Sequence, residues 1–520
     1  AMAFMIMGSI MIIRSMATFQ STKIHIKSIP SFVEPALNPL FCNSRICRPG
    51  HSPPCPLGVN FVHSRRQSSS SFQTIPTRTA IHRMGHERKS NKVTFTTTSL
   101  QLKESSIETS HLDDPPSSFP DWSFQPRDFF RYELIYQSKK SMARVGRIHT
   151  PHGIIDTPGF VAVATNGALK GLDMREADAA GQQLVFCNSY HLLLQPGPEI
   201  IEAAGGLHKF IHRPNGPLIT DSGGFQVFSL AYGSVQESLD TQGELKRANI
   251  KNTRKSGQNM KNADGGPPVK VTENGVFFKS YRDGRKILLT PESTVQAQKS
   301  YGADIIIPLD QLPPYYIDKK ALQESVDRSH RWETRSLKEH LKDLRNQAMY
   351  CVIHGGVDVS LRTKSVEYLT SLPFDGYAIG GSLGKNSDEL LNLLEWMMPM
   401  FEVGHRRDKP RHLLGIADEP SIRGSILHGI DTLDSCYPVR LSRHGTLLTR
   451  SGKIHIKSSK YSKEYGVPID PKCSCSTCAH YDRSYLWHLF KANEPLYISL
   501  AAVHNIHYMN DLMAQQRQDI

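Results

Sequence analysis

The chain contains 520 residues, of which 39% are hydrophobic and 21% are charged, and its formal net charge is +13. This composition excludes a collagen, a long coiled coil and a wholly disordered chain. The longest apolar run, Met2 to Ile13, is shorter than the roughly 18 residues of a membrane-spanning helix, so we expect no membrane span. The length allows about three domains, or one large α/β barrel with appendages.

The positive charge is concentrated at the amino end. Residues 1–100 contain twelve Lys or Arg and two acids, and so carry +10 of the +13. Residues 1–125 are rich in Arg, Ser, Thr and Pro and show no helical or strand period, which is typical of a transit peptide followed by a linker. We expect a disordered segment that directs the protein to a plastid or a mitochondrion. The alternatives are a disordered extension of a cytoplasmic protein and a start site misassigned upstream of Met16.

Residues 126–440 alternate short apolar runs with longer amphipathic stretches, which is the pattern of repeated βα units. The runs end in polar or glycine residues, and in a closed barrel such ends meet at one mouth, where active sites form. We therefore predict an α/β fold, a (β/α)8 TIM barrel, with a doubly wound open sheet as the alternative. The predicted strands are residues 160–165, 184–190, 217–221, 304–310, 349–354, 376–380, 412–417 and 432–437.

Residues 243–268 separate the third predicted strand from the fourth. They are polar and contain six Lys or Arg and two acids. A stretch of this composition and length predicts an insertion loop in the barrel domain.

The cysteines near the carboxyl end have the spacing of metal ligands, Cys473-x-Cys475-x2-Cys478. Three thiolates and one imidazole complete a tetrahedral zinc shell, and such a closed shell indicates one structural zinc per chain. His504, His488 and His507 are candidates for the fourth ligand, and spacing alone does not choose among them. We predict a zinc-binding subdomain over residues 441–520, with a terminal helix at about 481–492 and C-terminal helices that close the barrel.

Several motifs in one order resemble the tRNA-guanine transglycosylase family, also called queuine tRNA-ribosyltransferases, from about Phe129 to the carboxyl end. Residues 220–226 (TDSGGFQ) resemble its base-binding signature, and residues 434–440 (Asp-x3-Pro-x-Arg) its nucleophile segment. The Gly380-Gly381 pair and the cysteine cluster with His504-Asn505 also match, and this resemblance selects His504 as the fourth ligand. It implies a catalytic barrel with a zinc subdomain that exchanges the guanine at tRNA position 34 for a deazaguanine base in queuosine biosynthesis.

The expected chemistry divides between two carboxylates. Loss of a base from C1′ passes through an oxocarbenium-like state, which Asp434 can trap as a covalent glycosyl-enzyme. Asp221 suits proton transfer to and from the bases. Asp310 can accept hydrogen bonds from the purine, and Phe225 offers a stacking face. Further base contacts are expected from Ser222, Gly223, Gly224, Gly380 and Gly381.

Each of these assignments has a structural alternative. Asp221 or Asp310 can serve only as a helix N-cap, Phe225 can be a core residue, and the glycine pair can be an ordinary tight turn.

The segment from Arg440 to Lys463 contains seven Lys or Arg and no acid. We expect Arg440 and Arg443 to contact tRNA phosphates near the nucleophile, and Lys457 to Lys463 to form only a solvated face. The resemblance implies tRNAs for Asp, Asn, His and Tyr as substrates. It also implies a homodimer, or a heterodimer with a homologous subunit.

The chain departs from the family pattern around the base. His354 stands where the family usually has Gln after the fifth strand, and we expect it to contact the purine carbonyl in a pH-sensitive way. Gln311, Ser382 and Val439 are further departures. Gly384 replaces a larger aliphatic residue of bacterial enzymes, which predicts room for queuine instead of its aminomethyl precursor, preQ1. The alternative is that this glycine only turns the chain.

Two other classes of function compete with the transglycosylase. One is a non-catalytic tRNA-binding subunit of the same fold, against which the presence of both Asp221 and Asp434 argues. The other is a metal-dependent barrel hydrolase, which would ordinarily have His-x-His on the first strand, where this chain has none at residues 160–165.

Overall fold

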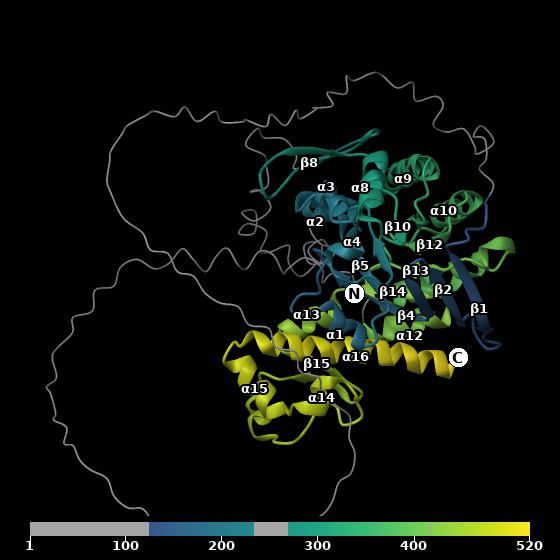
Figure 1. The fold of residues 1–520 in the computed structure, drawn as a ribbon. Helices are drawn as coiled ribbons and strands as arrows, with labels where there is room; N and C mark the ends of the chain where they lie inside the picture. The colour runs from purple at the N-terminus through teal and green to yellow at the C-terminus, as the bar shows by residue number, and fades with distance from the viewer. Residues whose placement is uncertain (1–123, 233–268, 417) are drawn as a thin grey trace, which may run out of the picture. The chain divides into compact units, whose positions relative to one another are not determined.

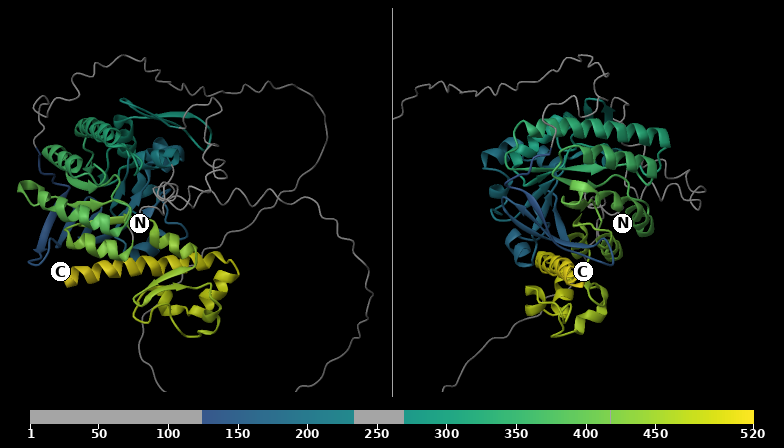
Figure 2. Two further views of the ribbon diagram at one scale, coloured as in Figure 1. Left: turned by 180° about the vertical axis from the view of Figure 1, so that it is seen from behind. Right: turned by 90° about the vertical axis from the view of Figure 1, so that its right-hand side faces the viewer.

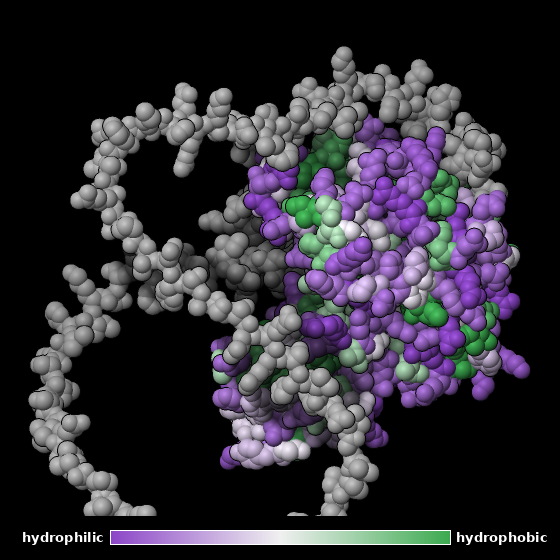
Figure 3. Space-filling model, in the orientation of Figure 1, coloured by the Kyte–Doolittle hydropathy of each residue, from purple (hydrophilic) through white to green (hydrophobic). Residues whose placement is uncertain are grey.

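The computed structural model describes residues 124–232, 269–416 and 418–520. Residues 1–123 of the predicted transit segment and the predicted insertion at 243–268 lie outside this part. No helix in the described ranges is long and apolar enough to cross a membrane. In the view of Figure 3, hydrophilic residues dominate the coloured surface, and the hydrophobic ones are scattered in small patches.

The central element is a closed parallel barrel, which confirms the predicted (β/α)8 fold and excludes the open sheet (Figure 1). Each of the eight predicted runs overlaps a barrel strand. Within the described residues the order around the barrel is β4, β5, β6, β10, β11, β12, β13 and β14, and β14 closes the barrel by pairing with β4. The barrel strands are β4 (Gly159–Ala164), β5 (Leu184–Cys187), β6 (Leu218–Thr220), β10 (Ile305–Ile306), β11 (Ala348–Ile353), β12 (Gly376–Ile379), β13 (Arg411–Leu413) and β14 (Thr432–Ser435).

Alternate strand residues point to two different parts of the core. In β4, Val161 and Val163 belong to the cluster inside the barrel, whereas Phe160, Ala162 and Ala164 pack in the cluster with the surrounding helices. Burial on both faces explains why the strands are apolar throughout.

The helices begin where capping side chains precede them. Asp318, Asp358, Asn386 and Asp418 each accept a backbone N–H from the first turn of the next helix. The helices around the barrel are α1 (Met174–Ala179), α2 (Ser189–Leu194), α3 (Pro198–Ala203), α4 (Leu207–Phe210), α5 (Gly224–Tyr232), α8 (Pro291–Tyr301), α9 (Lys319–Leu341), α10 (Val359–Ser371), α11 (Ser387–Met397), η6 (Met398–Phe401), η7 (Gly404–Arg406), α12 (Glu419–Leu427) and α13 (Tyr437–Arg443).

Two antiparallel sheets that the sequence analysis did not predict are attached to the barrel. The first comprises β1 (Arg131–Gln137), β2 (Arg144–Thr150) and β3 (Gly153–Thr157). Phe130, Ile148 and Ile155 join the cluster inside the barrel, so this sheet covers the amino ends of the strands. The second comprises β7 (Val269–Thr272), β8 (Gly275–Lys279) and β9 (Lys286–Leu289), between β6 and α8.

The carboxyl-terminal part contains a hairpin and helices. They are β15 (Thr446–Thr449), β16 (Gly452–His455), η8 (Ser459–Lys463), α14 (Ser476–His480), α15 (Arg483–Lys491) and α16 (Pro495–Asp519). The helix predicted at 481–492 is α15, but the terminal helix is α16. Figures 1 and 2 show α16 running between the barrel and the hairpin, and it contacts β4 and α13 on one side and β15 and α14 on the other.

Candidate active site

A cavity lies at the carboxyl ends of the barrel strands, where the sequence predicts the active site. Both proposed catalytic carboxylates line it, and so do the proposed base-binding residues Asp310 and Phe225. The lining residues are Phe186, Asn188, Asp221, Ser222, Phe225, Gln226, Ile307, Asp310, Leu312, Val352, Gly381, Leu414, Gly415 and Asp434. An apolar wall with a few convergent polar groups suits a flat heterocycle that is oriented by hydrogen bonds.

Asp221, which follows β6, is held by three donors. Its Oδ1 accepts the Ser189 N–H at 2.7 Å, and its Oδ2 accepts the side-chain amides of Asn188 and Gln226, both at 3.1 Å. Burial raises the pKa of Asp221, and the charge of Asp434 acts in the same direction, while the hydrogen bonds lower it. Ser189, which donates its backbone N–H, begins α2. Asp221 therefore anchors the start of the helix that follows β5. A carboxyl group with a raised pKa holds a proton more readily than a free aspartate, which suits a group that transfers protons.

Asp434, on β14, is 3% exposed and faces the same cavity. Its Oδ1 accepts the Gly415 N–H at 2.8 Å, and the Nε2 of His412 lies 3.3 Å from that oxygen. Both neighbours come from β13 or the turn after it, and β13 pairs with β14. One carboxylate oxygen of Asp434 is therefore engaged by the adjacent strand.

Asp310 follows β10, and burial raises its pKa to about 7, with a further contribution from the charge of Asp221. The Nε2 of His354 lies 3.6 Å from Asp310 Oδ2 and 3.1 Å from Glu333 Oε1, to which it is hydrogen-bonded. Burial lowers the pKa of His354 and raises that of Glu333. His354 thus lies behind Asp310, and it lines a second cavity beside the first.

The glycine motifs bring backbone close to other backbone. A Cβ on Gly223, whose φ is +83°, would lie 2.9 Å from the Tyr190 nitrogen, so the turn after Asp221 requires glycine. Gly224 begins α5, Gly381 lines both cavities, and the Gly380 carbonyl accepts a hydrogen bond from Arg362. Phe225 is half-buried in the cavity wall.

Gly384 has a φ of +104°, and a Cβ there would lie 2.6 Å from the Cβ of Glu389. It is not among the described residues that line either cavity. The backbone conformation and this close contact are sufficient to explain the glycine, which favours the alternative that it turns the chain.

Arg440 and Arg443 lie on α13, directly after the Asp434 strand. Burial raises the pKa of the Cys436 thiol. The charges of Arg440 and Arg443 lower this pKa, and the charge of Asp434 raises it. Burial lowers the pKa of Lys170, and the Arg443 charge acts in the same direction. Cationic side chains from α13 and from the loop after β4 therefore lie near Cys436, two residues after Asp434.

The sequence analysis missed several residues of the site. Gln226 stands inside the TDSGGFQ motif, and Asn188 is a polar residue near the end of the predicted strand 184–190, so both carried a signal. His412, Gly415 and Glu333 carried none, because each acts through a neighbouring strand or helix that is distant in the sequence.

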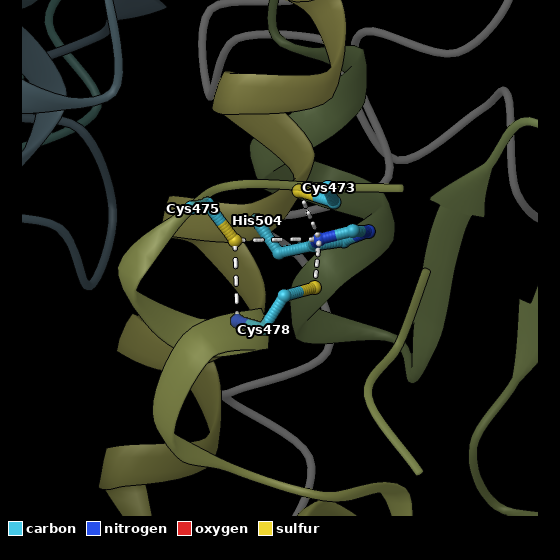
Figure 4. A group of neighbouring side chains, drawn as sticks. All are labelled: Cys473, Cys475, Cys478 and His504. Atoms are coloured by element: carbon cyan, nitrogen blue, oxygen red, sulfur yellow. Dashed lines mark hydrogen bonds between the residues drawn. The ribbon is translucent and has the colours of Figure 1, made fainter. Parts of the chain in front are cut away.

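The cysteine cluster and His504 form a group that can hold a metal ion (Figure 4). His504 Nδ1 lies 3.6 Å from the Sγ of Cys473, 3.6 Å from that of Cys475 and 3.3 Å from that of Cys478. Bonds of about 2.3 Å to sulfur and 2.0 Å to nitrogen in a tetrahedral shell would separate nitrogen and sulfur by about 3.5 Å. The His504 Nε2–H donates to the Leu448 carbonyl at 2.6 Å, which directs the Nδ1 lone pair at the thiols.

A second possible metal group, His152, His208 and Asp304, lies at the amino end of β10. The two imidazole rings are stacked with centroids 3.6 Å apart and planes 17° apart. Their lone pairs therefore run side by side instead of converging on one ion. Each ring is hydrogen-bonded to one oxygen of the buried Asp304 carboxylate, at 2.7 and 3.0 Å, so this group is a hydrogen-bonded cluster that joins the β2–β3 turn and α4 to β10.

Comparison with known proteins is consistent with this geometry. The profile of the family described as queuine tRNA-ribosyltransferase matches residues 138–520. The chain is 54% identical to a queuine tRNA-ribosyltransferase of Protochlamydia amoebophila over 392 residues. This alignment covers 75% of this chain and 95% of that protein. It is 50% identical to a queuine tRNA-ribosyltransferase of Chlamydia abortus over 391 residues, and this alignment covers 75% of this chain and 98% of that protein. The chain belongs to the queuine tRNA-ribosyltransferase family of glycosyltransferases.

Proposed function

We propose that this protein exchanges the guanine at position 34 of tRNAs with GUN anticodons for queuine, through a covalent glycosyl-aspartate. The observation that carries the proposal is that Asp221 and Asp434 line one cavity with unequal environments. The raised pKa of Asp221 suits proton transfer, whereas Asp434 presents a carboxylate whose second oxygen can attack.

In the first half-reaction, an oxygen of Asp434 bonds to C1′ of ribose while the bond from C1′ to N9 breaks. The bonding electron pair moves into the purine, and Asp221 donates the proton that makes free guanine neutral. In the second half-reaction, Asp221 takes the N9 proton of the incoming base, N9 bonds to C1′, and the ester bond to Asp434 breaks. Each carboxyl group returns to its starting state.

Recognition of the base rests on Asp310 and Phe225. The ionised Asp310 can accept the N1–H and the exocyclic amine of the purine, and Phe225 can stack on its face. His354 supports Asp310 from behind, because its Nε2 lies 3.6 Å from Asp310 Oδ2 and is hydrogen-bonded to Glu333. The pH dependence of base binding at this side of the purine is therefore assigned to the ionisation of Asp310.

The second cavity supports queuine as the incoming base. It shares Gly381 with the first cavity and is lined by polar groups that include Gln311, Ser382 and Asp358. The Ser382 hydroxyl is buried and has no hydrogen-bond partner among the described residues. A base with a diol substituent can fill this space and satisfy that hydroxyl, whereas preQ1, the alternative substrate, would leave most of it to water.

The tRNA would be held by cations beside the nucleophile. Phosphate contacts from Arg440 and Arg443 would place nucleotide 34 over Asp434, and binding should weaken as salt rises. The acceptor tRNAs for Asp, Asn, His and Tyr are part of the proposal. So is a second subunit, identical or homologous, that supplies part of the surface for the tRNA.

We propose that Cys473, Cys475, Cys478 and His504 bind one structural Zn²⁺. Bound there, the ion would cross-link α16 to the segment before α14 and would leave no open position for catalysis. Residues 1–125 are proposed to direct the protein to a plastid or a mitochondrion, which imaging of this segment fused to a fluorescent protein would test.

The exchange itself is tested by incubating labelled guanine with unmodified tRNA and the purified protein. The wild type should incorporate label, and Asp434→Ala should not. No exchange by the folded wild type would instead favour the second candidate, a non-catalytic tRNA-binding subunit. Competition between queuine and preQ1 for the same tRNA then decides the incoming base, and a preference for preQ1 would refute queuine.

A further inference from the structure

His412 is a buried side chain that the proposed mechanism does not yet use. It is fully buried in β13, beside the cavity, and its ring is nearly parallel to that of Phe186, with centroids 6.2 Å apart and planes 20° apart. Phe186 itself lines the cavity. The ring therefore lies between a residue of the cavity wall and the strand that carries Asp434.

The two ring nitrogens of His412 have different surroundings. Nδ1 lies 2.9 Å from the Thr432 hydroxyl oxygen, and His412 and Thr432 are direct neighbours in the pairing of β13 with β14. Nε2 has no hydrogen-bond partner among the described residues, although it lies 3.3 Å from Asp434 Oδ1. Thr432 and Asp434 are two residues apart on one strand and so project to the same side, which places both beside this ring.

A buried nitrogen without a partner is costly, and a small movement of either side chain would pair Nε2 with the carboxylate. If the Thr432 hydroxyl donates to Nδ1, the ring proton is on Nε2 and points at Asp434. The same Oδ1 already accepts the Gly415 N–H. Two donors from β13 and its following turn would then hold one oxygen and leave the other directed at the substrate.

We propose that His412 is a positioning residue that holds Asp434 Oδ1, so that Oδ2 is the oxygen that bonds to C1′. The inference rests on the proposed transglycosylase reaction and adds the atom and the neighbour through which it proceeds. When Oδ2 forms the ester, Oδ1 remains a carbonyl oxygen that still accepts both hydrogen bonds. When the ester breaks, the same donors stabilise the departing carboxylate.

The test compares His412→Phe, which keeps a ring of similar size, with His412→Gln, which can place an amide donor near the Nε2 position. The kcat and KM of guanine exchange are measured for each variant, with Thr432→Val as a second variant that removes the hydroxyl at Nδ1. We expect kcat of His412→Phe to fall about 100- to 1,000-fold with KM for RNA unchanged, as removal of one preorganised donor does. His412→Gln should recover most of the rate, and Thr432→Val should show a smaller loss of kcat.

Equal kcat values in the wild type and His412→Phe would overturn the inference alone. So would a loss of rate that His412→Gln does not recover, because simple packing explains it. If His412→Phe does not fold, Thr432→Val and His412→Gln decide by the same criteria. No exchange by the wild type would overturn the proposed function and the inference together. A structure of the trapped intermediate should show C1′ bonded to Oδ2, with Oδ1 within hydrogen-bond distance of Gly415 N, and the reverse arrangement would refute it.

Discussion

Replacing Asp221 with Asn separates catalysis from stability. The substitution keeps the shape of the side chain and removes the transferable proton, and the loss of a general acid or base lowers rates by about 10² to 10⁴, or about 3–5 kcal/mol in the barrier. We expect a fall of this size in kcat for guanine exchange, with little change in KM for the RNA.

The structure indicates that Asp221→Asn should not lose stability. Asn can keep its oxygen at the Ser189 N–H and place its amide where Asn188 and Gln226 now donate. Both neighbouring amides must then rotate to turn an oxygen toward the new amide, and Gln226 Oε1, which is buried without a partner among the described residues, is available as one such acceptor. Because the pKa of Asp221 is raised by burial, its ionised form is disfavoured by folding, and the neutral Asn removes this cost at neutral pH.

The assay measures initial rates of guanine exchange and thermal unfolding of the same samples at pH 7.5. We predict that the melting temperature of Asp221→Asn equals or exceeds that of the wild type, while its activity falls at least 100-fold. The reasoning is refuted if exchange is within about threefold of the wild type. It is also refuted if the variant is strongly destabilised, since the fall in rate would then report unfolding.

Three further predictions concern the base, the metal and the terminal helix. Because burial raises the pKa of Asp310 to about 7, KM for guanine should fall as pH rises from 6 to 8, and this dependence should be absent in Asp310→Asn; a KM independent of pH in the wild type would contradict it. A chelator, or Cys478→Ser, should release about one zinc per chain by elemental analysis and lower the melting temperature, and a chain that contains no zinc would refute the metal assignment. Asn505→Leu removes the buried hydrogen bonds with Leu448 N–H and with the carbonyls of Pro438 and Thr446. The free energy of unfolding, measured by chemical denaturation, should therefore fall by about 2–4 kcal/mol. A fall below about 0.5 kcal/mol would show that these bonds do not hold α16.

The barrel could be predicted from the sequence because its strands are continuous apolar runs that end in polar residues. The two antiparallel sheets could not, because half-exposed strands such as β1 show no clear alternation, with Ile135 and Tyr136 both exposed. Residues 269–289 also follow a polar stretch, and their pairing depends on contacts with α9, where Trp332 Nε1–H donates to the Glu273 carbonyl.

The site was predictable where one motif contains the functional groups, as in residues 220–226 and in the cysteine cluster. It was not predictable where a side chain acts across strands. His354 was expected at the base, but the sequence does not reveal that Glu333, a buried acid in the middle of α9, holds its Nε2. The meaning of Gly384 likewise depends on Glu389, whose Cβ occupies the adjacent space.

The most direct test of the account is to trap the glycosyl-enzyme. The wild type is mixed with an anticodon stem-loop that carries guanine at position 34 and with a base analogue that cannot complete the exchange, and the products are separated on a denaturing gel. We predict a protein band shifted by the mass of the RNA, absent in Asp434→Ala and present in Asp310→Asn. Exchange by the wild type without a covalent band, or a band that persists in Asp434→Ala, would contradict the assignment of Asp434 as the nucleophile.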